Sequence, residues 1–271
     1  FFSFSCFIGY LFKPTVLIIF IAAVILGIIN LLSGHKAEYK KAAAMLCCVA
    51  IAAASAFSVK HILVTRKKLP AEKSMTITHY LMMGLNSETE GVYSSDDVNY
   101  SINIGDKKAR QEANIKIIRE RLEKMGFNGF AKLVIKKNLS NYNDGTFTWA
   151  REGGFYKTVY PSDSRVKTAL RNFYFNKPEA FRFLAQTIWF FILLCICFSA
   201  FRKGSAYNGI ISLVALSLFG ESIFLLLFEC RARYLFLYLP LFLILAAVGL
   251  AASTEFCKKI IFERKIENGR N

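Results

Sequence analysis

Long apolar runs are the feature that most constrains the fold of this chain. Five of them can be drawn, each close to the roughly 20 residues that a helix needs to cross the hydrocarbon core of a bilayer. They cover residues 14–33, 42–60, 181–201, 208–228 and 235–253, and residues 1–12 have the composition of the end of a further span. Of the 271 residues, 54% are hydrophobic and 15% are aromatic, more than a soluble domain of this length carries. The sequence therefore predicts an α-helical polytopic membrane protein with about five to six transmembrane helices.

One long polar stretch interrupts the apolar runs. It covers residues 61–180, about the size of a small domain, and we expect one inserted extracytoplasmic domain of the α/β or α+β class there. Residues 1–60 are then transmembrane helices, the first of them truncated, residues 181–253 form three more, and residues 254–271 form a basic cytoplasmic tail. Because the chain opens on an apolar segment without Met, we expect it to be the C-terminal part of a longer protein.

Lysine and arginine residues in the short loops predict the orientation in the membrane. One side has only Lys13, Arg231 and Arg233 in its short segments. The other side carries many more cations in two short loops and the C-terminal tail: Lys36, Lys40, Lys41, Arg202, Lys203, Lys258, Lys259, Arg264, Lys265 and Arg270. Since cytoplasmic loops are enriched in Lys and Arg, we expect a multi-pass plasma-membrane protein with residues 61–180 outside and the C-terminus in the cytoplasm.

The net charge of +16 and the seven cysteines exclude two further classes of protein. Many of the cations flank apolar runs, where they suit anionic lipid headgroups, and no nucleic-acid-binding motif accompanies them. All the cysteines lie in or beside apolar runs, without a further Cys or His at metal-binding spacing. We therefore expect membrane lipids and no nucleic acid as partners, and neither disulfides nor zinc. No cofactor is expected, and a divalent cation is left open.

The polar stretch contains one clear helix. Asp106 can cap the N-terminus of a helix over residues 106–125, and Gly126 can end it in the left-handed conformation. Its apolar side chains repeat at intervals of three and four residues. For residues 131–139, periodicity does not decide between a second helix and a strand.

A segment early in the polar stretch mixes residue types that suit a binding site. Residues 78–97 combine His79, Asn86 and Asp97 with glycine and tyrosine. One interpretation is the pocket of a sugar or an acceptor. The alternative is a loop that folds over the membrane face, with His79 held by a structural hydrogen bond.

A second segment begins with Asn-Asp-Gly at residues 143–145, which predicts a turn that leads into an extended segment over residues 146–149. Trp149 and Glu152 follow among glycines. An aromatic ring can stack on the apolar face of a pyranose while carboxylates accept hydrogen bonds from its hydroxyl groups. The same composition also suits an ordinary glycine-rich turn.

The loop between the last two apolar runs places charges at the edge of the membrane. It reads Glu229-Cys230-Arg231-Ala232-Arg233-Tyr234, and two arginines are well suited to grip a phosphate. The three charged side chains converge only if the link is non-helical, because alternate residues of a helix point in nearly opposite directions. The alternatives are a Glu229 salt bridge that ties two helix ends, and arginines that contact headgroups.

Glu221 is a second ionisable residue in an apolar run. It lies eight residues before Glu229, about 12 Å deeper along a helix. It must face the helix bundle or a wet cavity. Binding of a substrate hydroxyl and pairing with an arginine are both open.

Three parts of the sequence together resemble the C-terminal part of bacterial GT-C membrane glycosyltransferases of the protein mannosyltransferase-like kind. They are the run from His79 to Asn86 with the later Asp97, the segment 144–155, and the Arg-Ala-Arg-Tyr-Leu pattern at 231–235. The resemblance covers most of residues 60–253. It implies transfer of a sugar from a polyprenyl-phosphate carrier to a cell-envelope glycan or another acceptor outside the membrane.

The resemblance also implies roles for particular residues. Arg231 and Arg233 would hold the carrier phosphate, while the catalytic carboxylate of this class usually lies in the first outer loop, which we expect to precede this chain. The predicted substrate-binding residues are Arg231, Arg233, Glu229, Tyr234, Glu221, His79, Asn86, Asp97, Trp149 and Glu152, and none is assigned to a metal. Two alternatives remain: a transporter or flippase of lipid-linked glycans, and a non-catalytic membrane partner subunit whose outer domain binds glycan or protein.

Overall fold

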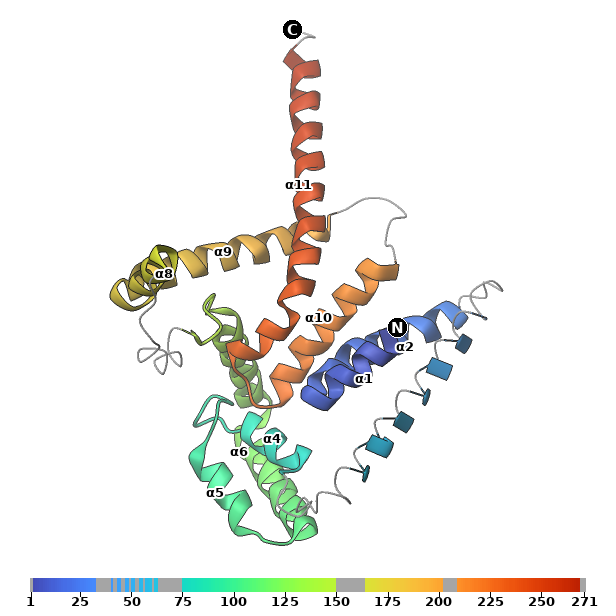
Figure 1. The fold of residues 1–271 in the computed structure, drawn as a ribbon, viewed down its shortest axis with the longest axis vertical. Helices are drawn as coiled ribbons and strands as arrows, with labels where there is room; N and C mark the ends of the chain where they lie inside the picture. Colours follow the sequence, from blue (N-terminus) through green and yellow to red (C-terminus); the bar gives the residue numbers. More distant parts are fainter. Residues whose placement is uncertain are drawn as a thin grey trace. The chain divides into compact units, whose positions relative to one another are not determined.

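The computed structural model of the chain describes residues 2–32, 75–149, 164–201 and 209–268, with scattered helical residues between 40 and 62. These ranges are helical apart from short links and contain no strand (Figure 1). An α/β or α+β inserted domain is therefore not supported, since the described part of residues 61–180 is helical. The physical reason lies in its composition, because residues 107–125 consist mainly of strong helix formers with few β-branched side chains.

Four helical stretches of the described residues are long and apolar enough to cross a membrane. They are Pro14–Leu32, Pro178–Ser199, Gly209–Leu227 and Ala232–Lys258. Each overlaps one of the predicted spans, which confirms four of them as apolar helices of sufficient length. Of the remaining predicted span, residues 42–60, the structure describes only scattered residues, and these are helical.

The contacts divide the chain into two compact units. Unit 1 consists of Phe1–Val134 and Tyr207–Glu229, and unit 2 consists of Ile135–Ala206 and Cys230–Asn271. Each unit therefore combines part of the polar stretch with apolar helices. The domain limits expected from the sequence stay predictions.

Unit 1 is built on the packing of α2 (Leu17–Leu32) against α10 (Gly209–Leu227), which lie side by side (Figure 1). The buried residues of α2 are small, namely Ala22, Ala23 and Gly27. Small residues let apolar helices approach closely. The other elements of this unit are α1 (Phe2–Phe12), η1 (Pro14–Val16), α4 (Ile77–Gly84), α5 (Ser95–Asn103) and the first part of α6 (Lys107–Tyr142).

Helix α6 confirms the predicted helix and shows what interrupts it. The Asp106 carboxylate accepts a hydrogen bond from the backbone N–H of Ala109 at 2.7 Å, which satisfies a free donor of the first turn. At Gly126, φ is +56° and ψ is −172°, so the backbone leaves the helical conformation and the helix kinks there. The helical part beyond Gly126 includes residues 131–139, for which the sequence left helix and strand open.

Unit 2 is built around Trp189 on α9 (Pro178–Ser199), whose side chain is 1% exposed. The indole N–H donates to the Tyr142 carbonyl at 2.9 Å. Its ring meets those of Phe147 and Phe242 edge-on, with centroids 5.0 and 5.1 Å away. One core thus joins α9 to the end of α6 and to α11 (Leu239–Asn268); the other elements of unit 2 are α8 (Arg165–Asn176) and η4 (Ala232–Tyr238).

Candidate functional site

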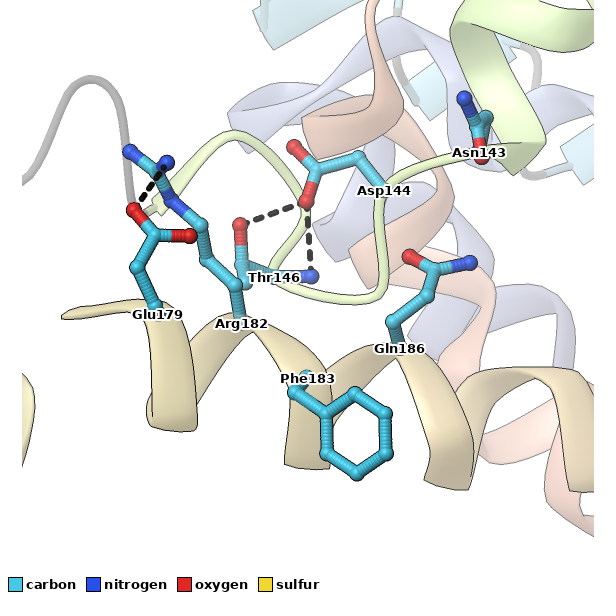
Figure 2. Close-up of a pocket in the computed structure, with 7 residues that line it drawn as sticks. All are labelled: Asn143, Asp144, Thr146, Glu179, Arg182, Phe183 and Gln186. Atoms are coloured by element: carbon cyan, nitrogen blue, oxygen red, sulfur yellow. Dashed lines mark hydrogen bonds and ion pairs between the residues drawn. The ribbon is translucent and has the colours of Figure 1, made fainter. Parts of the chain in front are cut away.

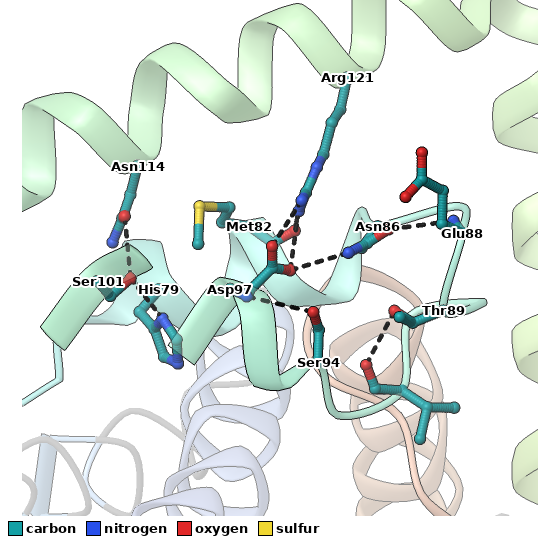
Figure 3. Close-up of polar contacts among 11 residues, drawn as sticks. His79, Met82, Asn86, Glu88, Thr89, Ser94, Asp97, Ser101, Asn114 and Arg121 are labelled. Atoms are coloured by element: carbon teal, nitrogen blue, oxygen red, sulfur yellow. Dashed lines mark hydrogen bonds and ion pairs between the residues drawn. The ribbon is translucent and has the colours of Figure 1, made fainter. Parts of the chain in front are cut away.

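Two of the predicted site residues, Asn86 and Asp97, meet in unit 1, where the buried Asp97 carboxylate is the shared partner of several side chains (Figure 3). Arg121 of α6 binds the Asp97 carboxylate with both guanidinium ends, at 2.6 Å to Oδ1 and 3.0 Å to Oδ2. The Asn86 amide donates to the same Oδ2 at 3.1 Å. Arg121 also donates to the Met82 carbonyl at 2.6 Å, so a single side chain links α4, α5 and α6.

The local sequence explains why Asp97 points inward. Ser94 is the N-cap of α5 and its hydroxyl accepts from the Asp97 backbone N–H at 3.2 Å, which starts the helix. The preceding loop turns at Asn86, whose side-chain oxygen accepts from the Glu88 N–H at 3.0 Å, and at Gly91, with φ of +74°. The turn and the cap together fix the carboxylate beneath α6.

His79 takes part in a second buried chain of hydrogen bonds. Its Nδ1 lies 2.8 Å from the Ser101 hydroxyl, which donates to the Asn114 side-chain oxygen at 3.1 Å (Figure 3). With the hydroxyl proton directed to Asn114, a proton on Nδ1 of His79 completes the chain of hydrogen bonds. Burial lowers the pKa of His79; the Asp97 charge raises it and the Arg110 charge lowers it further. The imidazole is therefore neutral at neutral pH.

The lowered pKa of His79 makes unit 1 sensitive to acid. The pKa of His79 is 6.5 in the unfolded chain and lower in the folded chain, so below pH 6.5 the unfolded chain binds a proton at this ring more readily. Stability therefore falls as the pH decreases from 6.5 toward the pKa of the folded chain. We expect the unfolding midpoint in detergent to decrease on acidification through this window. His79→Gln removes the titration and should flatten that dependence, and an equally steep curve would contradict the assignment.

Two sets of buried hydrogen bonds in unit 1, one around Asp97 and one around His79, have a structural role. His79, Asn86 and Asp97 each form side-chain contacts with other residues of α4, α5 and α6. Buried polar groups that are paired in this way fix one arrangement of the helices. Their role in binding a sugar or an acceptor stays a prediction.

Unit 2 contains a pocket of about 380 Å³ beside the start of α9 (Figure 2). Glu179, Arg182 and Gln186 are spaced by three and four residues, so they share one face of that helix. Arg182 Nη1 lies 3.2 Å from Glu179 Oε1. The residues that line the pocket are Asn143, Asp144, Thr146, Glu179, Arg182, Phe183 and Gln186.

The opposite wall of the pocket is a tight loop organised by Asp144. Its Oδ1 accepts from the Thr146 N–H at 2.9 Å and from the Thr146 hydroxyl at 2.6 Å, and its Oδ2 accepts from the Thr148 N–H at 2.7 Å. The Gly145 N–H donates to the Gln186 side chain at 2.8 Å, and a Cβ at Gly145 would collide with the Ala185 carbonyl. Only glycine therefore lets the loop approach α9 this closely.

The predicted turn at residues 143–145 is confirmed, but the extended segment over residues 146–149 is wrong. Phe147 and Thr148 have φ values of +52° and +65°, in the left-handed region. The Asp144 carboxylate holds two backbone N–H groups that follow it, which closes the chain into a compact turn instead of a strand.

Trp149 ends this loop and does not line the pocket. Its side chain is 45% exposed, and its carbonyl accepts from the Tyr174 hydroxyl at 2.6 Å. Glu152, the other predicted sugar-binding residue of this segment, lies outside the described residues. The roles of both stay predictions.

The predicted charges near the last two apolar runs fall in different units. Glu221 and Glu229 belong to unit 1 and are buried, Glu221 completely. Arg231 and Arg233 belong to unit 2, where Arg231 is extended with φ of −157° and ψ of +137°. The Arg233 guanidinium lies 5.4 Å from the centroid of the Tyr234 ring, within cation–π range. Convergence of the charges on a phosphate stays a prediction.

Several site residues were missed by the sequence analysis. Arg121 sat on a charged helix face that predicts solvent exposure, and its partner is 24 residues away. The spacing of Glu179, Arg182 and Gln186 at the start of a span was the available signal for the pocket. Nothing in the sequence indicated that Lys137 is fully buried; burial lowers its pKa to about 8, while the electrostatic interaction with Cys230 raises it.

Among the residues that the structure describes, no group of three or more His, Cys, Asp or Glu side chains could hold a metal ion. The side chains that line the described pocket provide carboxylates, amides, a hydroxyl, a guanidinium and a phenyl ring.

A family model described as a conserved hypothetical integral membrane protein matches residues 1–254. No curated protein and no solved structure matches the chain. The match covers nearly the whole chain and agrees with the apolar helices.

Proposed function

The chain belongs to this family of integral membrane proteins, and we propose that it is a membrane glycosyltransferase that moves a sugar from a polyprenyl-phosphate carrier to an extracytoplasmic cell-envelope acceptor. The observation that carries the proposal is the pocket at the start of α9. It combines two carboxylates, a guanidinium and two amides at the end of a helix long enough to cross the membrane. A lipid-linked sugar phosphate presents its polar end at that level of the bilayer.

The size and lining of the pocket suit the sugar end of such a carrier. Its volume of about 380 Å³ lies within the range of roughly 300 to 1,000 Å³ typical of small-molecule sites. Amide, hydroxyl and carboxylate groups can pair with sugar hydroxyls, and the Phe183 ring offers an apolar face. The fixed loop around Asp144 supplies one preorganised wall.

Arg182 is the residue that we assign to the phosphate. Its present partner, Glu179, has a side chain that is 84% exposed, and exposed ion pairs contribute only about 0.2 to 1 kcal/mol. A phosphate can accept two hydrogen bonds from one guanidinium, so it competes well for Arg182. The departing phosphate gains charge during transfer, and a guanidinium beside it lowers the barrier. Glu179, once released, is a free carboxylate beside the sugar hydroxyls.

Arg182→Ala is expected to reduce sugar transfer by about a hundredfold, because one charge-stabilising donor typically contributes a factor of that order. The assay measures transfer from a polyprenyl-phosphate sugar to envelope acceptor material by the full-length protein in proteoliposomes. Lys116→Ala is the matched control, since Lys116 also forms an exposed helical ion pair, 3.9 Å from Glu120, and is not one of the residues that line the pocket. Its transfer rate should equal that of the wild type.

The same assay distinguishes the other interpretations. If Arg231→Ala and Arg233→Ala abolish transfer while Arg182→Ala leaves it unchanged, the phosphate site lies at the 231–235 loop and the assignment of Arg182 is wrong. If the protein binds the lipid-linked sugar but transfers nothing to any acceptor, the protein is a non-catalytic partner. Movement of the carrier between leaflets without transfer would identify a transporter.

A further inference from the structure

Helix α8 (Arg165–Asn176) has an apolar stripe that, among the residues the structure describes, meets another ring only at one end, where Phe173 contacts Phe181. Val166, Ala169, Leu170 and Phe173 follow the spacing i, i+3, i+4 and i+7, which places them on one face. Val166 is 68% exposed and Leu170 is 63% exposed, and α8 contains no buried residue. A water-soluble surface would leave this stripe unfavourably hydrated.

The rest of α8 is strongly basic. Cations accompany the stripe at Arg165, Lys167 and Arg171, and Lys177 follows directly after the helix. No acidic residue occurs between positions 164 and 178. An apolar stripe with cations on its flanks is typical of a helix that lies in the plane of a membrane surface, where long basic side chains reach anionic headgroups.

The position of α8 in unit 2 fits that location. Only Lys177 separates it from α9, which is long and apolar enough to cross the membrane. The rings of Phe173 and Tyr174 meet the Phe181 ring at 6.1 and 4.9 Å, so the end of α8 is fastened to the start of α9. The start of a transmembrane helix lies at the headgroup region, and the stripe of α8 begins there as well.

We propose that α8 is an interfacial helix that inserts Val166, Ala169 and Leu170 into the bilayer surface and binds anionic phospholipid headgroups through Arg165, Lys167 and Arg171. This face of α8 binds the lipid surface. Its cations, with no acidic residue among them, match anionic headgroups, and only Lys177 separates the helix from a membrane span. This contact with the membrane surface is independent of glycosyl transfer.

The same contact would hold the pocket at a fixed depth. The Tyr174 hydroxyl donates to the Trp149 carbonyl at 2.6 Å, and Trp149 ends the loop that Asp144 organises. Helix α8 therefore connects the membrane surface to one wall of the pocket through a short chain of contacts. A lipid-bound α8 keeps that wall at headgroup level.

The experiment places a photoreactive benzophenone amino acid in the full chain, at Leu170 in one variant and at Thr168 in another. Thr168 lies on the opposite side of α8, about 160° from Leu170 at 100° per residue. Both variants are reconstituted in vesicles of phosphatidylcholine and phosphatidylglycerol, and the crosslinked products are identified by mass spectrometry. We expect lipid products from Leu170 and few from Thr168. Phosphatidylglycerol should be enriched about fivefold or more over its share of the vesicle.

The basic residues are tested separately from the apolar stripe. In Arg165→Gln/Lys167→Gln/Arg171→Gln, lipid crosslinking from Leu170 should persist while the enrichment of phosphatidylglycerol disappears. Raising the salt concentration should also reduce the enrichment of phosphatidylglycerol by the unsubstituted helix, because salt screens the charges without any substitution. Crosslinks from Leu170 to protein, or equal lipid labelling from both positions, would overturn the membrane placement. Enrichment that survives in the triple variant would overturn the headgroup assignment.

Discussion

Asp97→Ala is expected to lower the free energy of unfolding of unit 1 by about 3 to 5 kcal/mol. The Asp97 side chain is 7% exposed and that of Arg121 is 23% exposed, so the substitution leaves a largely buried guanidinium without its carboxylate. It also removes the acceptor of the Asn86 amide. Denaturant unfolding in detergent, followed by helical circular dichroism and by hydrogen exchange of α4 to α6, measures the loss.

Asp96→Ala is the matched control for this experiment. Asp96 lies in the same first turn of α5 but is exposed, so its loss should cost only the weak favourable interaction with the helix N-terminus, about 0.3 to 1 kcal/mol. Asp97→Ala/Arg121→Met should recover much of the lost stability, because both charges are then absent. Equal effects of the two single alanine variants would show that the buried pair does not hold the helices together.

The apolar helices and one polar helix could be predicted because their signals are local. Asp106 caps the first turn of the polar helix, and Gly126 interrupts it. Both residues lie directly beside the helical residues that they affect. Apolar runs of sufficient length likewise predict their own spans. Such features need no knowledge of what packs against them.

The candidate site depended on pairings between residues that are distant in the sequence. Arg121 is separated from Asp97 by 24 residues, and the Gly145 backbone N–H meets the Gln186 side chain 41 residues away. Hydrophobic periodicity carries no information about such partners. Asp144 shows the same limit at short range: the Asn-Asp-Gly sequence predicted a turn, but the three hydrogen bonds to the carboxylate decide how far the turn continues.

Gly249→Ala is expected to destabilise unit 2 by about 1 to 3 kcal/mol or more, because it forces apart two helices that touch through their backbones. A Cβ at Gly249 of α11 would collide with the carbonyl group of Cys195 in α9 and lie 2.9 Å from the Ser199 nitrogen. Backbone atoms cannot move aside as a flexible side chain can. Close approach through small residues stabilises apolar helix pairs in a bilayer, so this contact should hold α9 and its pocket residues in place.

Two other glycines of apolar helices provide a graded control for Gly249→Ala. A Cβ at Gly209 meets nothing within 4 Å, so Gly209→Ala should leave the unfolding midpoint in detergent nearly unchanged. At Gly220 the nearest atom is the Ile18 side-chain methyl Cγ2 at 2.8 Å, which can rotate away, and an intermediate effect is expected. The three midpoints should therefore rank Gly209→Ala, Gly220→Ala, Gly249→Ala in decreasing order. A Gly249→Ala midpoint equal to that of Gly209→Ala would mean that α9 and α11 do not pack through this residue.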